Sequence, residues 1–128
     1  MTGKPAHFKD ITLLITHYNR SSSLERLLET FHQFGVSFYE IIVSDDCSNE
    51  KHQHQLLILQ GKFGFRLILS EKNRGLADNI NKGQAAVKSL YTLYIQEDFV
   101  PEAKFTACLN DGYNLIKEFP DIDLVRFY

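Results

Sequence analysis

The sequence predicts one α/β domain, a three-layer sandwich with helices on both sides of a mainly parallel sheet. Residues 41–43 form a continuous β-branched run, which is typical of a strand buried on both faces. Runs of this kind alternate along the chain with segments of helical periodicity, as expected for right-handed crossovers in a parallel sheet. The chain has 128 residues, enough for one such domain with a real core and too few for two.

The first strand is expected at residues 11–16, after an irregular lead-in at 1–9. Ser22 and Glu25, three residues apart, make a capping box and predict the start of the first helix. Apolar residues then recur at helical spacing, and Gly35 ends the run. They are Leu24, Leu27, Leu28, Phe31 and Phe34.

The second strand is expected at residues 40–44, and it must break where acids and small turn-formers begin. Leucines around Leu56 suggest a short second helix in an otherwise polar segment. The third strand is expected at 65–70. His52, in the polar segment around the second helix, and Lys82, in the helix predicted after the third strand, are expected on solvated helix faces.

The last part of the chain repeats the alternation. We expect a helix at 76–88, a strand at 90–95, a helix from Pro101 to about residue 119, and a fifth strand at 122–127. The final strand ends without a following loop, which suggests that the chain is a fragment of a longer protein.

Composition excludes several classes of function. The formal net charge is −2, so no basic field indicates nucleic acid or an acidic membrane as the main partner. Cys47 and Cys108 form neither a metal-binding spacing nor a disulfide framework, and a reducing cytoplasm suits them. We find no signal peptide and no apolar run of membrane-spanning length.

Polar side chains follow three of the predicted strands. Because the carboxyl ends of parallel strands meet at one edge of a sheet, they should open onto one crevice, where open α/β sheets bind ligands. A simpler interpretation is that one acid of the Asp45–Asp46 pair caps the next helix, but Ser48 could serve as that cap. Asn73 and Gly75 precede another helix, where free backbone amides suit a phosphate. The strand-end residues are Thr16, Tyr18 and Asn19, then Asp45 and Asp46, then Glu97 and Asp98.

Four segments in this order resemble the nucleotide-sugar half of family-2 glycosyltransferases, which have the GT-A fold. I-T-H-Y-N-R at 15–20 is similar to that family's P-T-Y-N-R, and I-I-V-S-D-D-C-S-N at 41–49 to its I-I-V-V-D-D-G-S-T. N-R-G-L-A-D-N-I-N-K-G at 73–83 resembles its N-x-G-x-x-x-A-x-N-x-G. Y-I-Q-E-D-F-V-P at 94–101 resembles its metal motif, D-x-D or E-D-D with a proline shortly after.

The resemblance implies a role for each matching residue. Thr16 and Tyr18 would hold the nucleobase, Tyr18 by stacking. Asp46 would accept a hydrogen bond from the ring N–H of the base, which favours uracil, while Asp45 braces the turn. Asp98 would bind Mg²⁺ or Mn²⁺ between the two phosphates of the donor. The remaining residues of the donor site would be Asn19, Asn73, Gly75, Asp78, Asn79 and Glu97.

The sequence departs from the family pattern at three positions. His17 and Cys47 replace small residues, and Gln96 stands at the first acid of the metal motif, so Asp98 is the one strong metal carboxylate. The family's general base comes from the half of the chain that would follow Tyr128. The catalytic residue is therefore left unassigned.

The resemblance implies an enzyme, or its donor-binding part, that moves a sugar from a nucleotide-diphosphate donor, UDP-linked by the Asp46 argument, to an acceptor hydroxyl. Glycan or polysaccharide synthesis on a glycan or lipid-linked acceptor, at the cytoplasmic side of a membrane, is the implied setting. The alternative is a non-catalytic nucleotide-binding module that lacks a general base. A phosphoacceptor receiver domain would need an acidic pair after the first strand, and a dinucleotide-binding domain a G-x-G-x-x-G there; the sequence has neither.

Overall fold

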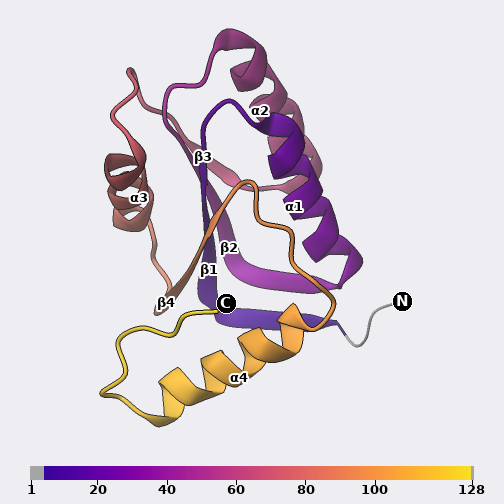
Figure 1. Ribbon diagram of the computed structural model, residues 1–128, viewed down its shortest axis with the longest axis vertical. Helices are drawn as coiled ribbons and strands as arrows, with labels where there is room; N and C mark the ends of the chain where they lie inside the picture. Colours follow the sequence, from indigo (N-terminus) through magenta and orange to yellow (C-terminus); the bar gives the residue numbers. More distant parts are fainter. Residues whose placement is uncertain (1–4, 128) are drawn as a thin grey trace.

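The computed structural model describes residues 5–127, and within them strands and helices alternate along the whole chain (Figure 1). This confirms the predicted α/β class. The elements are β1 (Ala6–His17), α1 (Ser21–Gln33), β2 (Val36–Asp45), α2 (Glu50–Phe63), β3 (Arg66–Ile68), α3 (Leu76–Ala85), β4 (Tyr91–Gln96) and α4 (Phe105–Glu118).

The strands form one parallel sheet in the order β3-β2-β1-β4. β1 is central, and its residue Leu13 pairs with Ile41 of β2 on one side and with Leu93 of β4 on the other. All the carboxyl ends therefore point to the same edge of the sheet, which is the geometry on which the predicted crevice depends.

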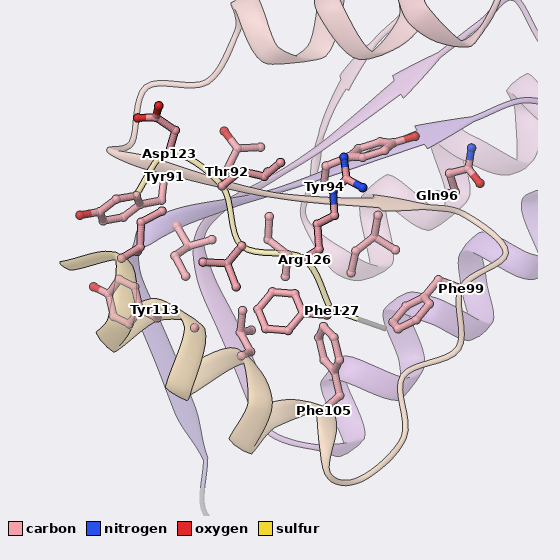
Figure 2. Close-up of a pocket in the computed structure, with 18 of the residues that line it drawn as sticks. Tyr91, Thr92, Tyr94, Gln96, Phe99, Phe105, Tyr113, Asp123, Arg126 and Phe127 are labelled. Atoms are coloured by element: carbon pink, nitrogen blue, oxygen red, sulfur yellow. The ribbon is translucent and has the colours of Figure 1, made fainter. Parts of the chain in front are cut away.

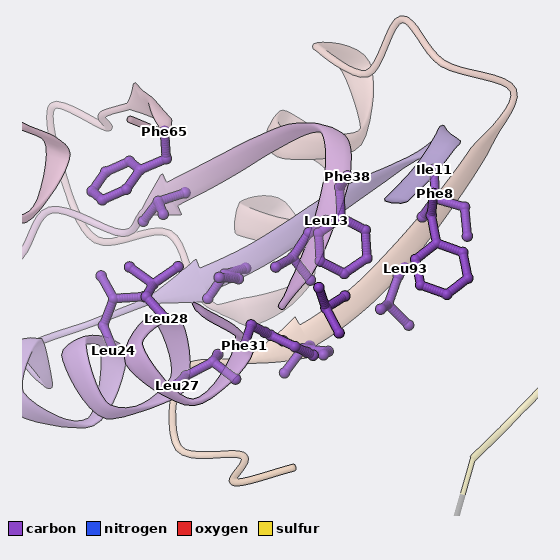
Figure 3. Packing of buried hydrophobic residues seen from close by; sticks show 14 of the residues in the cluster. Phe8, Ile11, Leu13, Leu24, Leu27, Leu28, Phe31, Phe38, Phe65 and Leu93 are labelled. Atoms are coloured by element: carbon purple, nitrogen blue, oxygen red, sulfur yellow. The ribbon is translucent and has the colours of Figure 1, made fainter. Parts of the chain in front are cut away.

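Alternate residues of the central strands face opposite layers. Leu13 and Ile15 belong to the main apolar core, together with the inner faces of α1 and α2. Figure 3 shows part of this cluster, with Leu13 and the α1 residues labelled. Leu14, which points the other way, lies against α3 at Gly83, where a side chain would collide with it. Figure 1 shows this division, with α1 and α2 on one side of the sheet and α3 on the other.

The first two strands begin earlier than expected. Residues 6–8 pair with 36–38, and the register shifts between Phe8 and Thr12. The lead-in predicted at residues 1–9 was therefore wrong from Ala6 onward. Residues 36–39 alternate between buried and exposed, a period-two pattern that could have revealed the start of β2. Phe8 and Phe38 stack with ring centroids 5.9 Å apart and extend the core across this end of the sheet.

The helix starts also differ from the prediction. α1 has no side-chain cap, so the capping box expected at Ser22 and Glu25 does not form. Asn49, not Ser48, caps α2 by accepting a hydrogen bond from the His52 amide at 3.1 Å. α2 is a full helix of 14 residues rather than a short one. α4 begins at Phe105 instead of Pro101, which lies in the preceding loop.

The predicted fifth strand at 122–127 is not a strand in the structure. A strand needs a hydrogen-bonding neighbour, but this segment is an irregular coil (Figure 1), and its Val125 and Phe127 side chains lie beside Gly112 of α4. The Phe127 ring lies 5.7 Å from that of Phe105, and it fills the space beside Gly112. In residues 5–127, no helix is long and apolar enough to cross a membrane.

Candidate donor site

The loop between β1 and α1 is held by hydrogen bonds that its backbone amides donate to side chains. The Tyr18 amide donates to Glu97 Oε2 at 2.9 Å, the Asn19 amide to Ser48 Oγ at 2.9 Å, and the Arg20 amide to His17 Nε2 at 3.1 Å. Asn19 has a φ of +51°, a conformation that asparagine tolerates well. The Tyr18 side chain is 45% exposed, so the loop presents this ring to solvent from a fixed backbone.

Asp45 at the end of β2 is fully buried and faces the turn rather than the crevice. Its Oδ1 accepts from His17 Nδ1 at 2.8 Å and from the Ser48 hydroxyl at 2.6 Å, and its Oδ2 accepts from the Ser48 amide at 3.0 Å. Burial alone would raise the pKa of Asp45, but the hydrogen bonds from His17 and Ser48 outweigh it and lower the pKa. Asp45 is thus a buried anion that organises the turn.

Asp46 joins the end of β2 to the loop before α3. Its Oδ1 accepts from the Arg74 amide at 2.8 Å and its Oδ2 from the Gly75 amide at 3.0 Å. The sequence predicted that the amides at this helix start are free to bind a phosphate. That prediction is wrong for these two amides, because both donate to Asp46. Asn73 Nδ2 also donates to the Asp46 carbonyl at 3.3 Å. A carboxylate has about four acceptor positions, so Asp46 retains the capacity to bind one further donor.

Asn79 lies on the inner side of α3 and is buried. Its Nδ2 donates to the Ser44 carbonyl at 2.9 Å, and its Oδ1 lies 2.8 Å from the Ser44 hydroxyl. Its side chain thus fastens α3 to β2. The exposed Asp78 precedes it in the first turn of α3.

Lys82 also binds the sheet rather than water, contrary to expectation. Its Nζ donates to the Asp45 carbonyl at 2.6 Å and to the Ser70 hydroxyl. Burial lowers the pKa of Lys82, and the carboxylates of Asp45, Asp46 and Asp78 partly offset this.

Two acids follow β4 and face the β1–α1 loop. Glu97 lies beneath the loop, where burial raises its pKa against the lowering effect of the hydrogen bond from the Tyr18 amide. Asp98 is farther out, with its side chain 49% exposed, and its Oδ2 lies 3.2 Å from Arg20 Nη1. The Thr16 hydroxyl shares a hydrogen bond of 2.8 Å with the Tyr94 hydroxyl. The backbone carbonyl of Thr16 accepts a hydrogen bond from the Glu97 amide.

The structure thus brings the predicted residues together in two groups at one edge of the sheet. One group joins Thr16 and Tyr18 to Glu97, with Arg20 of the same loop bound to Asp98. Asn19 is fixed separately, by its amide to Ser48 and by its side chain to the Asn49 amide. The other joins Asp46 to Asn73 and Gly75. The His17 carbonyl, which accepts from the Asp46 amide at 3.0 Å, links the two groups.

Of the carboxylates at this edge, Asp98 is the one placed to share a divalent cation with a ligand. Within residues 5–127 no group of three His, Cys, Asp or Glu side chains is placed to hold a metal, so these residues make no closed site. Asp98 is exposed at the edge, whereas Asp45 and Asp46 are buried and bound to amides. Mg²⁺ is commonly held by one or two carboxylates with substrate phosphates and water, and Asp98 satisfies that requirement.

A large cavity of about 740 Å³ lies beside this edge, between β4, α4 and the segment at 123–127 (Figure 2). Phe99, Phe105, Phe127 and Tyr113 contribute to its wall, and Gln96 and Asp98 are among the polar residues that line it. The aromatic lining suits packing against apolar groups rather than the binding of a diphosphate.

Sequence reasoning missed three residues that organise the site. His17 is fully buried against Asp45, His52 Nδ1 shares a hydrogen bond of 2.8 Å with the Ser21 hydroxyl, and Arg20 pairs with Asp98. The one available signal was the departure of His17 from the small residue of the family pattern. A histidine inside a strand end that is otherwise apolar must find polar partners there.

Comparisons with known proteins agree with this geometry. The family model described as "Glycosyl transferase family 2" matches residues 12–116. An uncharacterized glycosyltransferase of Haemophilus influenzae is 30% identical over 96 residues, and the alignment covers 72% of this chain and 31% of that protein.

Solved structures with the same fold include S. aureus TarS 1-349 in complex with UDP-GlcNAc, at a TM-score of 0.66 and 18% identity. That match covers 85% of this chain and 31% of the TarS chain. Glucosyl-3-phosphoglycerate synthase from Mycobacterium tuberculosis, in a complex with Mn²⁺, UDP and glucosyl-3-phosphoglycerate, matches at 0.63 and 17% identity, over 82% of this chain and 39% of that one. The chain thus spans about a third of the length of these relatives, and it belongs to glycosyltransferase family 2, with the GT-A fold.

Proposed function

We propose that this chain is the donor-binding part of a glycosyltransferase that moves a sugar from a UDP-linked donor to an acceptor hydroxyl. The observation that carries the proposal is that Tyr18, Asp46 and Asp98 come from three different strand ends and meet at one edge of the sheet. Family membership supports nucleotide-sugar transfer in general. The complexes of TarS with UDP-GlcNAc and of the mycobacterial synthase with UDP support uridine as the nucleoside.

The base would lie on the exposed Tyr18 ring. The backbone that carries this ring is fixed, because the Tyr18 amide donates to Glu97 and the Asn19 amide to Ser48. Stacking on an aromatic face accepts any base, so selection requires a hydrogen bond. Asp46 accepts from two amides and keeps further acceptor capacity. A carboxylate there favours a base that offers a ring N–H, as uracil does.

The diphosphate would lie near Asp98 and Arg20. Asp98 would hold a divalent cation there, and such a cation would supply charge neutralisation for the departing diphosphate. The Arg20 guanidinium, which pairs with Asp98 in the structure and is 57% exposed, is free to turn toward phosphate oxygens because an exposed ion pair is weak. The Mn²⁺ complexes of the mycobacterial synthase and of a Pyrobaculum calidifontis mannosyltransferase support this assignment of the cation.

We further propose that the acceptor belongs to glycan or polysaccharide synthesis at the cytoplasmic face of a membrane. The support is membership of glycosyltransferase family 2, and this chain spans 31% of the length of the curated relative.

The test is isothermal titration of the chain with UDP, GDP and CDP, each with and without Mn²⁺. We expect UDP to bind most tightly and Mn²⁺ to strengthen that binding. Equal affinity for the three nucleotides would refute the role of Asp46, and UDP binding that is unaffected by Mn²⁺ would refute the role of Asp98. Absence of binding by all three would refute the donor site as a whole.

A further inference from the structure

The most unusual feature of this edge that the proposed function does not use is the buried imidazole of His17. It is the last residue of β1 and directly precedes Tyr18. Its side chain is fully buried, as is that of Asp45, with which it pairs at 2.8 Å. A histidine placed here does more than fill space, because both of its ring nitrogens have polar partners.

These partners determine which nitrogen carries the proton. Asp45 is held as an anion by its hydrogen bonds and can only accept, so His17 Nδ1 donates to it. The Arg20 backbone amide lies 3.1 Å from Nε2 and can only donate, so Nε2 accepts. The neutral ring with its proton on Nδ1 is the one form that satisfies both contacts.

His17 takes the place of a helix cap. α1 has no side-chain cap of the ordinary kind, yet the Arg20 amide at its start is bound by Nε2 of His17. The next amide, that of Ser21, points to His52 Nδ1 at 3.4 Å. Two imidazoles therefore accept the first amides of α1, at the end of the helix that carries partial positive charge.

We propose that His17 is a positioning residue that, only while neutral, holds the β1–α1 loop in the geometry that presents Tyr18 and Arg20 to the donor. The proposal rests on the proposed donor site for its functional consequence, but not for the behaviour of the loop itself. Tyr18 and Asn19 are fixed by Glu97 and Ser48. His17 Nε2 accepts a hydrogen bond from the third amide of the loop, that of Arg20.

Protonation would act on one side of the ring. The groups that face His17 are Asp45 from β2, Glu97 after β4, Arg20 from its own loop, and His52 from α2, whose ring centroid is 6.4 Å away. An imidazolium keeps its bond to Asp45, but its second N–H then points at the Arg20 N–H. Two donors cannot bond, so the start of α1 is released while the rest of the cluster stays in place.

Three variants separate this role from simple packing. His17→Asn retains a donor for Asp45 but has no acceptor that reaches Arg20. His17→Gln offers an acceptor at the longer reach and does not ionise. His32→Asn, on the exposed side of α1, is the matched control for removing a histidine.

The first measurement is nuclear magnetic resonance of the ligand-free chain over a pH series that begins in mild alkali and descends until the His17 ring is charged. Nitrogen shifts of the His17 ring should show the proton on Nδ1 at the upper end. Hydrogen exchange of the Arg20 amide, corrected for its intrinsic pH dependence, should lose protection in step with protonation of His17. A ring protonated on Nε2 at the upper end, or Arg20 protection that ignores the titration, would overturn the proposal.

The second measurement is the affinity for uridine as a function of pH. Uridine is chosen because it has no phosphate group whose own ionisation would contribute to the pH profile. In the wild-type chain and in His32→Asn, affinity should fall about threefold to tenfold as His17 becomes charged, the loss expected for one hydrogen bond. His17→Gln should match the wild-type chain at the upper end and show no such fall. His17→Asn should bind weakly at every pH.

An unchanged pH profile in His17→Gln would overturn the coupling between His17 and donor binding. Failure of uridine and UDP to bind any of these chains would refute the proposed function instead. The exchange data on Arg20 would still decide the role of His17 in the loop.

Discussion

Replacement of the buried Asp45 by asparagine tests whether this carboxylate organises the turn as an anion. Asp45→Asn preserves the shape of the side chain. Oδ1 can still accept from His17 and from the Ser48 hydroxyl, which lie 2.8 and 2.6 Å from it. The new NH₂ group, however, replaces Oδ2 and faces the Ser48 amide, which donates at 3.0 Å in the structure.

The cost can be worked from these contacts. One buried donor loses its partner, at about 1–3 kcal/mol, and two hydrogen bonds lose the strengthening that a charge gives them. Removal of a buried charge returns part of this. We therefore expect Asp45→Asn to lower the free energy of unfolding by about 2–4 kcal/mol, against about 0.5 kcal/mol or less for Asp111→Asn, an exposed control on α4.

The effect should depend on pH in a defined direction. The pKa of Asp45 is lowered in the folded chain from its unperturbed value of 3.8. Its contribution to stability is therefore complete above that value and is lost as the pH falls through the folded pKa. Urea unfolding followed by circular dichroism should show that the difference in unfolding free energy between wild type and Asp45→Asn narrows as the pH falls below 3.8. A loss under about 0.5 kcal/mol at neutral pH, or a gap that persists in acid, would refute this reasoning.

Three further predictions concern the site and the packing behind it. Asp98→Asn should remove the effect of Mn²⁺ on UDP affinity and leave the melting temperature unchanged; a retained effect in titration calorimetry would exclude Asp98 as the ligand. Asp46→Ala should weaken UDP by about 1–3 kcal/mol and CDP, whose base has no ring N–H, by less, and equal losses would remove the argument for uracil. Gly83→Ala should destabilise by about 1–2 kcal/mol, because its methyl group meets Leu14, an overpacking cost larger than the gain in helix propensity. Gly61→Ala, where nothing lies within 4 Å of the added methyl group, should instead stabilise by about 0.5–1 kcal/mol; thermal unfolding that gives both variants the same sign would contradict the close approach of α3.

The alternation of apolar runs with helical periodicity was sufficient to predict the fold. Strands buried on both faces have to be continuous apolar runs, as at residues 41–43 in the sheet core. The boundaries were less accessible. The early part of β1 carries charged and polar residues such as Lys9 and Asp10, and it is a strand because it pairs with residues 36–38, far away in sequence.

The segment at 122–127 shows the opposite case, in which local pattern misleads. Its apolar residues are compatible with a strand, but Phe127 packs against Phe105 and Gly112 of α4. The choice between pairing with a strand and covering a helix is made by tertiary contacts, which the local sequence does not contain.

The site was predicted as a location more than as a set of contacts. Polar residues after buried strands mark the edge where ligands bind, and the structure places Tyr18, Asp46 and Asp98 there. What each side chain does at that edge depends on partners. The Asn79 side chain fastens α3 to β2 by donating to the Ser44 carbonyl, and His17 accepts a hydrogen bond from the Arg20 amide. Neither contact could be predicted from residue type or spacing.

The most direct test of the donor site is a nuclear magnetic resonance titration of the labelled chain with UDP and Mg²⁺. The account predicts the largest amide shifts at Tyr18, Gly75 and Asp98, which lie on the strand-end edge. Shifts concentrated instead at Phe105 and Tyr113, in the wall of the large cavity beside α4, would contradict it and place the nucleotide elsewhere.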